Sequence, residues 1–215
     1  MSKQWTRWLI YILGLFTLAV GLSLCTKANL GIMPIFSVSY AMARITNQQL
    51  GDVTFLLYCV FVAGEFLLRG NNRRWTDLFQ LPLSLVFGKM LNLLGGLMAY
   101  DGTQHGLFSN LAVLALAILC TGVGICMSVN MRLVPNPGDG IVQALAERMN
   151  WEQGFAKNVF DLGCVATTVV LSLALTGEII GLGIGTVAAM LGVGRVVSII
   201  NRLTKEKMCR AAGLL

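Results

Sequence analysis

Six long apolar runs, separated by short charged or proline- and glycine-rich segments, constrain this chain more than any other feature. Such runs reach the roughly 17–25 residues that a helix needs to cross the hydrocarbon core of a bilayer. Of the 215 residues, 56% are hydrophobic and only 12% are charged, about half the charge of a soluble domain. We therefore predict an all-α, polytopic membrane protein with about six transmembrane helices. The predicted spans are 8–25, 53–68, 78–98, 107–129, 155–175 and 179–203.

Basic residues gather beside particular spans. Lysine and arginine are enriched in the cytoplasmic flanks of membrane proteins, and segment 100–106 contains neither. This bias predicts that both termini lie in the cytoplasm, and it attributes the net charge of +6 to the topology of the chain rather than to nucleic-acid binding. The flanking basic residues are Lys3, Arg7, Arg69, Arg73, Arg74, Arg202, Lys205, Lys207 and Arg210.

The two halves of the chain follow one plan. Segment 30–51 reads LGIMPIFSVSYAMARITNQQLG and segment 133–154 reads LVPNPGDGIVQALAERMNWEQG. We predict two membrane repeats, 1–103 and 104–215, with three spans each, so that the second repeat enters the membrane from the opposite side. Inverted repeats of this kind recur in secondary transporters. The matching residues are Leu30, Pro34, Ala41, Ala43, Asn47 and Gly51 in the first repeat and Leu133, Pro137, Ala144, Ala146, Asn150 and Gly154 in the second.

A proline interrupts the apolar pattern at the same place in each repeat. Proline is tolerated in the first turn of a helix, so Pro34 and Pro137 predict helices that run to about Arg44 and Arg148. Each is too short to span a bilayer and is either re-entrant or interfacial. Interrupted helices at corresponding positions of two repeats mark the binding sites of transporters.

Polar and charged residues around these breaks predict a solute site. Helix starts present free N–H groups and a partial positive charge, and charged residues within spans are expensive unless functional. Glu65, Lys89, Asp161 and Arg195 are such residues; alternatively, the two bases pair with the two acids or reach an interface. Asp139 either caps its helix or binds a cation. The candidate substrate-binding residues are Asn29, Pro34, Ser37, Lys89, Asn130, Pro137, Gly138, Asp139, Gly140, Asp161, Thr186 and Arg195.

The sequence offers little for other chemistry. Its six cysteines lie mainly in or beside apolar runs, and His105 is the only histidine, so we expect no metal site, no cofactor and no enzymatic activity. The glycine-rich run 181–194 has no preceding strand and indicates close helix packing rather than a nucleotide loop. Glycine-rich helix faces also permit a homodimer.

The second half of the chain resembles the YitT/YczE-like family of bacterial integral membrane proteins. That family shows a G-x-x-P-x-D segment, a short helix, a glycine turn and a GIGT stretch before the last span. Pro137, Asp139, Gly154 and the stretch 183–186 match this pattern, whereas Phe36 stands where the family often has an acid. The resemblance implies a polytopic inner-membrane protein, often suggested to be a transporter.

The leading functional hypothesis is a transporter or permease for a small anionic or polar organic solute, bound near the midplane between the repeats. Its expected partners are that solute and the lipid bilayer, not nucleic acid. Two alternatives stay open: a substrate-binding membrane subunit of an ATP-driven uptake system, whose ATPase would be a separate protein because no Walker motif is present, or a non-transporting modulator of a partner protein.

Overall fold

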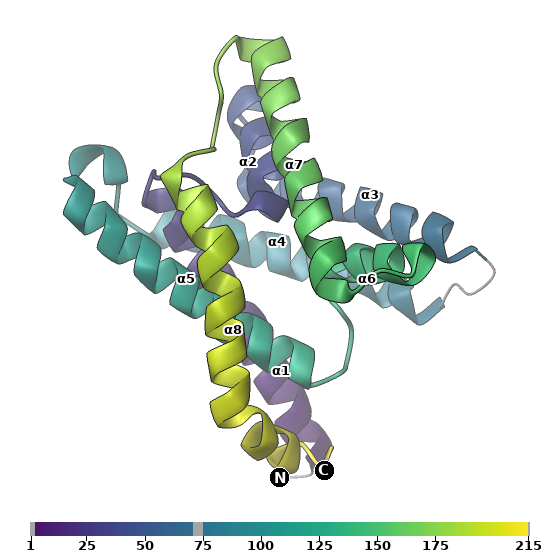
Figure 1. The fold of residues 1–215 in the computed structure, drawn as a ribbon. Helices are drawn as coiled ribbons and strands as arrows, with labels where there is room; N and C mark the ends of the chain where they lie inside the picture. The colour runs from purple at the N-terminus through teal and green to yellow at the C-terminus, as the bar shows by residue number, and fades with distance from the viewer. Residues whose placement is uncertain (1–2, 71–74, 215) are drawn as a thin grey trace. The chain divides into compact units, whose positions relative to one another are not determined.

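The computed structural model describes residues 3–70 and 75–214, and these ranges contain helices and loops but no strand. The predicted all-α fold class is confirmed (Figure 1). Within these described ranges, six helical segments are long and apolar enough to cross a membrane. Arg73 and Arg74, which contribute to the predicted charge bias, lie outside the described residues. The α-helices are α1 Lys3–Lys27, α2 Pro34–Thr46, α3 Leu50–Arg69, α4 Gln80–Leu97, α5 Leu107–Asn130, α6 Pro137–Met149, α7 Gln153–Thr176 and α8 Ile184–Ala211, and the 3-10 helices are η2 Trp75–Phe79 and η3 Gly102–Gln104.

The two short helices begin at the predicted prolines and have 13 residues each. At about 1.5 Å per residue, such a helix covers well under the thickness of the hydrocarbon core. The side chain of Asn136 caps α6 by accepting a hydrogen bond from Gly138 N at 3.1 Å. The predicted short helices after Pro34 and Pro137 are therefore present.

The order of elements repeats along the chain. Short helices α2 and α6 are each followed, after a turn, by the long helices α3 and α7. The residues Asn47 and Asn150, which close the short helices, both have the left-handed backbone with φ near +54°. Asparagine tolerates this region better than most residues. The structure thus repeats helix for helix, and the inverted orientation of the repeats stays a prediction.

The described chain divides into two compact units, and each takes segments from both halves of the sequence. Unit 1 comprises residues 1–33, 93–133 and 183–215, and unit 2 comprises residues 34–92 and 134–182. The predicted repeats 1–103 and 104–215 are a division of the sequence, whereas these units are a division by packing.

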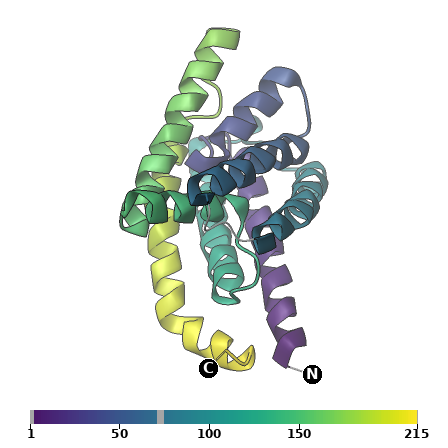
Figure 2. The same ribbon diagram turned by 90° about the vertical axis from the view of Figure 1, so that its right-hand side faces the viewer.

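Glycines let the helices of unit 1 approach closely. Helix α5 packs against both α1 and α8. A side chain at Gly14 of α1 would meet the backbone of α5 at Ser128, and one at Gly124 of α5 would meet α1 at Leu18. Small residues serve this purpose in membrane helix pairs. Both chain ends belong to this unit and lie near each other (Figure 2), since Gly213 adjoins the side chain of Lys3.

In unit 2, each short helix packs against a long helix of the other repeat. Helix α2 contacts α7, and α6 contacts α3. An aromatic group fills the space between α2, α3 and α4, with ring centres 6.1 Å apart for Phe36 and Tyr58 and 6.3 Å apart for Tyr58 and Phe87. This exchange of partners is the pattern expected when two repeats share one core.

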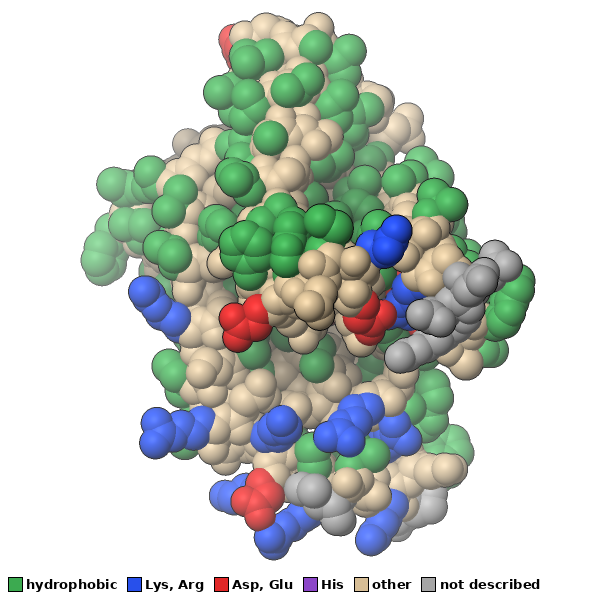
Figure 3. All heavy atoms as spheres, turned by 45° about the vertical axis from the view of Figure 1, so that its right-hand side comes forward, with side chains coloured by type: hydrophobic (Ala, Val, Ile, Leu, Met, Phe, Trp, Pro, Cys, Tyr) green, Lys and Arg blue, Asp and Glu red, His purple; other side chains and the backbone are tan. Residues whose placement is uncertain are grey.

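Many large apolar side chains face outward. Leu67 of α3, Phe108 of α5 and Leu162 of α7 are more than 60% exposed, and apolar side chains cover much of the visible surface (Figure 3). Contiguous exposed apolar surface is unfavourable in water but matches the hydrocarbon of a bilayer. The exposed faces therefore agree with the hydropathy of the spans.

Candidate functional site

In unit 2, the starts of α2 and α6 lie side by side. A Cβ atom at Gly138 would come within 2.6 Å of Ile35 Cδ1, so glycine permits this close approach. Pro34, Pro137, Gly138 and Gly140 are all buried. We call residues 34–37 and 136–140 the paired helix starts. The side chain of Ile35 thus brings the two proline breaks into contact, and their use as one binding site stays a prediction.

Ser37 connects α2 to α7. Its hydroxyl lies 2.6 Å from the carbonyl oxygen of Pro34 and 2.7 Å from the hydroxyl of Thr168. Thr168 in turn lies 2.8 Å from the carbonyl oxygen of Cys164. Ser37 and Thr168 are fully buried, so the polar atoms of this contact are satisfied within the protein.

Asp139 lies in the first turn of α6, and its side chain is half-buried. Of the two alternatives for this residue, capping is wrong, because Asn136 is the cap. Burial raises the pKa of Asp139 above its ordinary value; the charge of nearby Lys157 opposes this shift, and that of Asp161 adds to it. The Asp139 carboxylate is therefore available to a ligand or a proton.

Asp161 of α7 carries a buried carboxylate beside Asp139. Its side chain pairs through Oδ2 with Lys157 Nζ at 3.0 Å, and only 4% of the residue is exposed. Among the described residues, Oδ1 has no hydrogen-bond partner. A buried acceptor without a partner is costly, so this oxygen is a natural contact for a donor on a ligand.

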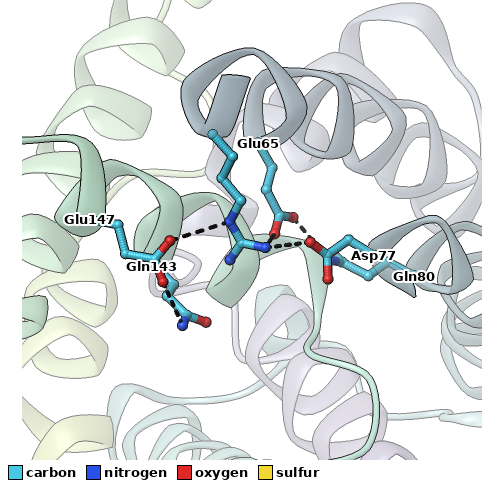
Figure 4. Close-up of polar contacts among 6 residues, drawn as sticks. Glu65, Asp77, Gln80, Gln143 and Glu147 are labelled. Atoms are coloured by element: carbon cyan, nitrogen blue, oxygen red, sulfur yellow. Dashed lines mark hydrogen bonds and ion pairs between the residues drawn. The ribbon is translucent and has the colours of Figure 1, made fainter. Parts of the chain in front are cut away.

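A polar network adjoins the start of α6, and all its members except the exposed Glu147 are buried (Figure 4). Gly140 lies against it, because a Cβ there would meet Glu65 Oε2 at 2.6 Å. Gln80 Nε2 donates to the same carboxylate at 2.9 Å, and Arg69 pairs with Glu65 at 2.9 Å. Arg69 also pairs with Asp77 and lies 3.5 Å from Glu147 of α6. We call Glu65, Arg69, Asp77, Gln80 and Glu147 the Glu65 network.

The sequence identified only Glu65 from this network. The charge pattern places Arg69 in a cytoplasmic flank, and the sequence makes no prediction for Asp77, Gln80 and Glu147. One signal was present, because Glu65 and Arg69 are four positions apart and such residues face each other on a helix. No feature of the sequence predicts that α6 contributes Glu147 to this network.

Lys89 lies elsewhere in unit 2. Its side chain is 65% exposed and pairs with Asp52 at 2.9 Å. Asn92 Nδ2 donates to the same carboxylate at 3.1 Å and its Oδ1 accepts from Gly51 N. The alternative that Lys89 pairs with Glu65 or Asp161 is wrong, and Lys89 instead helps to join α3 to α4.

The remaining predicted residues belong to unit 1, and two of them bond to neighbouring segments of that unit. Asn29 adopts φ 54° in the turn after α1, and Asn130 Nδ2 donates to Asn201 Oδ1 at 2.7 Å. Thr186 accepts a hydrogen bond from Gly183 N at 3.2 Å and closes the start of α8. Arg195 is exposed. These contacts are structural within unit 1.

Six long apolar helices and two short helices that start at buried prolines define a polytopic α-helical membrane protein. The chain belongs to a family of unknown function (DUF6198), whose model matches residues 5–202. This agrees with the resemblance to YitT/YczE-like membrane proteins.

Two relatives are similar along most of their length. The uncharacterized membrane protein YczE of Bacillus subtilis (strain 168) is 23% identical over 185 residues, which cover 81% of this chain and 83% of that protein. An uncharacterized protein of Haemophilus influenzae (strain ATCC 51907 / DSM 11121 / KW20 / Rd) is 26% identical over 214 residues, covering 94% and 88% respectively. No solved structure matches this chain.

Proposed function

We propose that the protein is a transporter or permease for a small polar organic solute, and that the solute binds at the paired helix starts of unit 2. One observation carries this proposal: Ile35 and Gly138 bring together two short helices that occupy equivalent positions in the two repeats. Irregular backbone at membrane depth is tolerated only in protein or along a wet cavity. In transporters, such interrupted segments hold the substrate.

The charges around α6 favour a solute that carries both an anionic group and a donor. The start of a helix stabilises an anion, and Lys157 adds a positive charge nearby. Asp161 Oδ1, which has no hydrogen-bond partner among the described residues, and the carboxylate of Asp139 can accept hydrogen bonds from an ammonium group or another donor on the solute. The sequence bases the anionic group of the solute on the two helix starts together with Lys89 and Arg195. Lys89 pairs with Asp52, and Arg195 is exposed in unit 1, so the helix starts and Lys157 are left to favour this group.

The proposal includes an orientation. Lys3, Arg7, Arg202 and Lys205 flank the first and last spans, and the positive-inside rule then favours both termini in the cytoplasm. The similarity to a bacterial membrane protein supports placement in a bacterial inner membrane. Two three-span repeats in one chain would also be inverted with respect to each other.

A ligand screen tests this function. Purified protein would be heated with pools of small polar metabolites, and bound solute would stabilise the native state. We expect a zwitterionic or polar hit whose stabilisation is lost in Asp139→Asn and Asp161→Asn and kept in Glu178→Gln, which changes an exposed acid of unit 2. Hits whose stabilisation is unchanged in Asp139→Asn and Asp161→Asn would contradict the site. Variants that act only through expression level would favour a modulator instead.

A further inference from the structure

A cavity of about 300 Å³ opens at the end of unit 1 that holds both chain termini, and it is lined by Arg132, Asn201, Arg202, Lys205, Glu206, Cys209 and Leu214. We call it the basic pocket. It is formed by the turn after α5 together with the last part of α8. Lysine and arginine side chains gather at this end in the space-filling view (Figure 3).

The turn that presents Arg132 is held firmly. Arg132 has a left-handed backbone with φ 48°, a conformation that is uncommon for a residue other than glycine. Arg7 of α1 donates from Nε to the carbonyl oxygen of Met131 and from Nη2 to that of Arg132, both at 2.7 Å. Asn130 and Asn201 bond at 2.7 Å between α5 and α8. The wall of the pocket is therefore preorganised.

The pocket has an excess of positive charge. Within the described residues, Arg132, Arg202 and Lys205 have no carboxylate within 4.0 Å. The acid in the lining, Glu206, is paired with Arg210 at 2.6 Å. Cations that share a wall repel one another, and an anion between them would remove that cost.

The position of the basic pocket relative to the membrane-spanning part of α8 indicates what kind of anion it binds. Helix α8 has 28 residues, more than the roughly 20 that cross the hydrocarbon, so its basic end extends into the headgroup region. Ile199, one turn before Arg202, is 58% exposed, and Leu203, between Arg202 and Lys205, is 65% exposed. They offer an apolar surface to acyl chains. Basic pockets beside membrane helices bind anionic headgroups.

We propose that the basic pocket binds a phosphate group, supplied by an anionic phospholipid headgroup or by a soluble phosphate compound. Arg132 and Arg202 offer planar donor forks that match phosphate oxygens. Lys205 adds a point charge from one turn further along α8. The proposal is independent of the solute site in unit 2.

Purified, delipidated protein would be titrated in three arms: phosphatidylglycerol, phosphatidylcholine and inorganic phosphate. We expect phosphatidylglycerol to stay bound in native mass spectrometry and to raise the unfolding temperature, and phosphatidylcholine to do neither. A response to inorganic phosphate alone would identify a soluble phosphate as the source. No response to either phosphatidylglycerol or inorganic phosphate would overturn the proposal.

Variants connect the binding to the pocket. Arg202→Gln and Lys205→Gln change exposed side chains, so folding should be retained. Each should weaken binding about fivefold, which corresponds to about 1 kcal/mol per removed cation. Lys207→Gln is the matched control, because it removes an exposed cation from the same end of α8 without lining the pocket. Equal losses in all three variants would show general attraction to charge and would overturn the assigned site.

Discussion

At the scale of single residues, the start of α6 divides two tasks between Asn136 and Asp139. Asn136 accepts the hydrogen bond from Gly138 N and so satisfies the helix. The Asp139 carboxylate, in the first turn and half-buried, is left for other partners. Because Asn136 already caps α6, the fold does not need the carboxylate of Asp139 at the start of this helix.

Removing the cap should weaken the fold. Asn136→Ala leaves the N–H of Gly138 without its acceptor, and loss of such a cap costs about 1 kcal/mol. We expect a lower unfolding temperature in detergent, measured against Asn158→Ala, a change on the exposed face of α7. Equal stability of Asn136→Ala and the wild type would contradict the assignment of the cap.

Asp139 should also give the stability a dependence on pH. Its native pKa is raised above the ordinary value of 3.8, so the native state holds the proton more tightly than the unfolded state. Stability from this group is complete below about pH 3.8 and is lost as pH rises through the native pKa. Asp139→Asn should therefore gain in unfolding temperature relative to wild type between pH 4 and pH 7. A difference that stays constant or falls would contradict the raised pKa.

At the scale of elements, the sequence predicted the helices well because hydropathy and proline positions report directly on them. Runs of sufficient apolar length must be helical in a membrane, and Pro34 and Pro137 do start α2 and α6. Hydropathy does not predict which helices pack against each other, because it reports only how far a segment lies within the membrane. The pairing of α6 with α3, and with it the Glu65 network, appears only in the structure.

Lys89 shows the same limit in detail. It was predicted as an intramembrane cation, but α3 begins at Leu50, three residues before the predicted span. This start places Asp52 in the first turn, where it pairs with Lys89. A small error at a helix boundary thus changed the role of a residue on another helix.

The contact between α3 and α4 can be tested with a matched pair of glycines. A Cβ at Gly51 would overlap the carbonyl oxygen of Gly88, whereas one at Gly154, the equivalent residue of α7, meets nothing within 4 Å. Gly51→Ala should lower stability by about 1–3 kcal/mol through overpacking. Gly154→Ala should be neutral or stabilising, since alanine favours helices. Thermal unfolding of both variants measures this, and equal effects would contradict the close contact.

At the scale of the whole chain, the helices of the two sequence halves are mixed in the packing rather than kept apart. Unit 1 and unit 2 each draw segments from both halves, so neither half contains all the partners of its own helices. The repeat in the sequence predicted equivalent elements correctly but not this exchange, because identities at a fixed offset carry no information about packing partners.

The proposed orientation makes a simple prediction. Six spans place both ends of the chain on one side, and the basic flanks favour the cytoplasm. Reporters that are active only in the cytoplasm should work when fused at either terminus, and periplasmic reporters should work at neither. A fusion after Thr103, between α4 and α5, should give the opposite result. Reporters that place the two ends on different sides would contradict six spans.

The most direct test of the central claim is the affinity of the identified solute for Asp139→Asn protein, measured by calorimetry beside wild type and Glu178→Gln. Hydrogen bonds to charged groups contribute about 1.5–3 kcal/mol, so the account predicts at least about a tenfold loss of affinity for Asp139→Asn. Glu178→Gln should bind as the wild type does. Equal affinity for all three proteins would contradict a solute site at the paired helix starts.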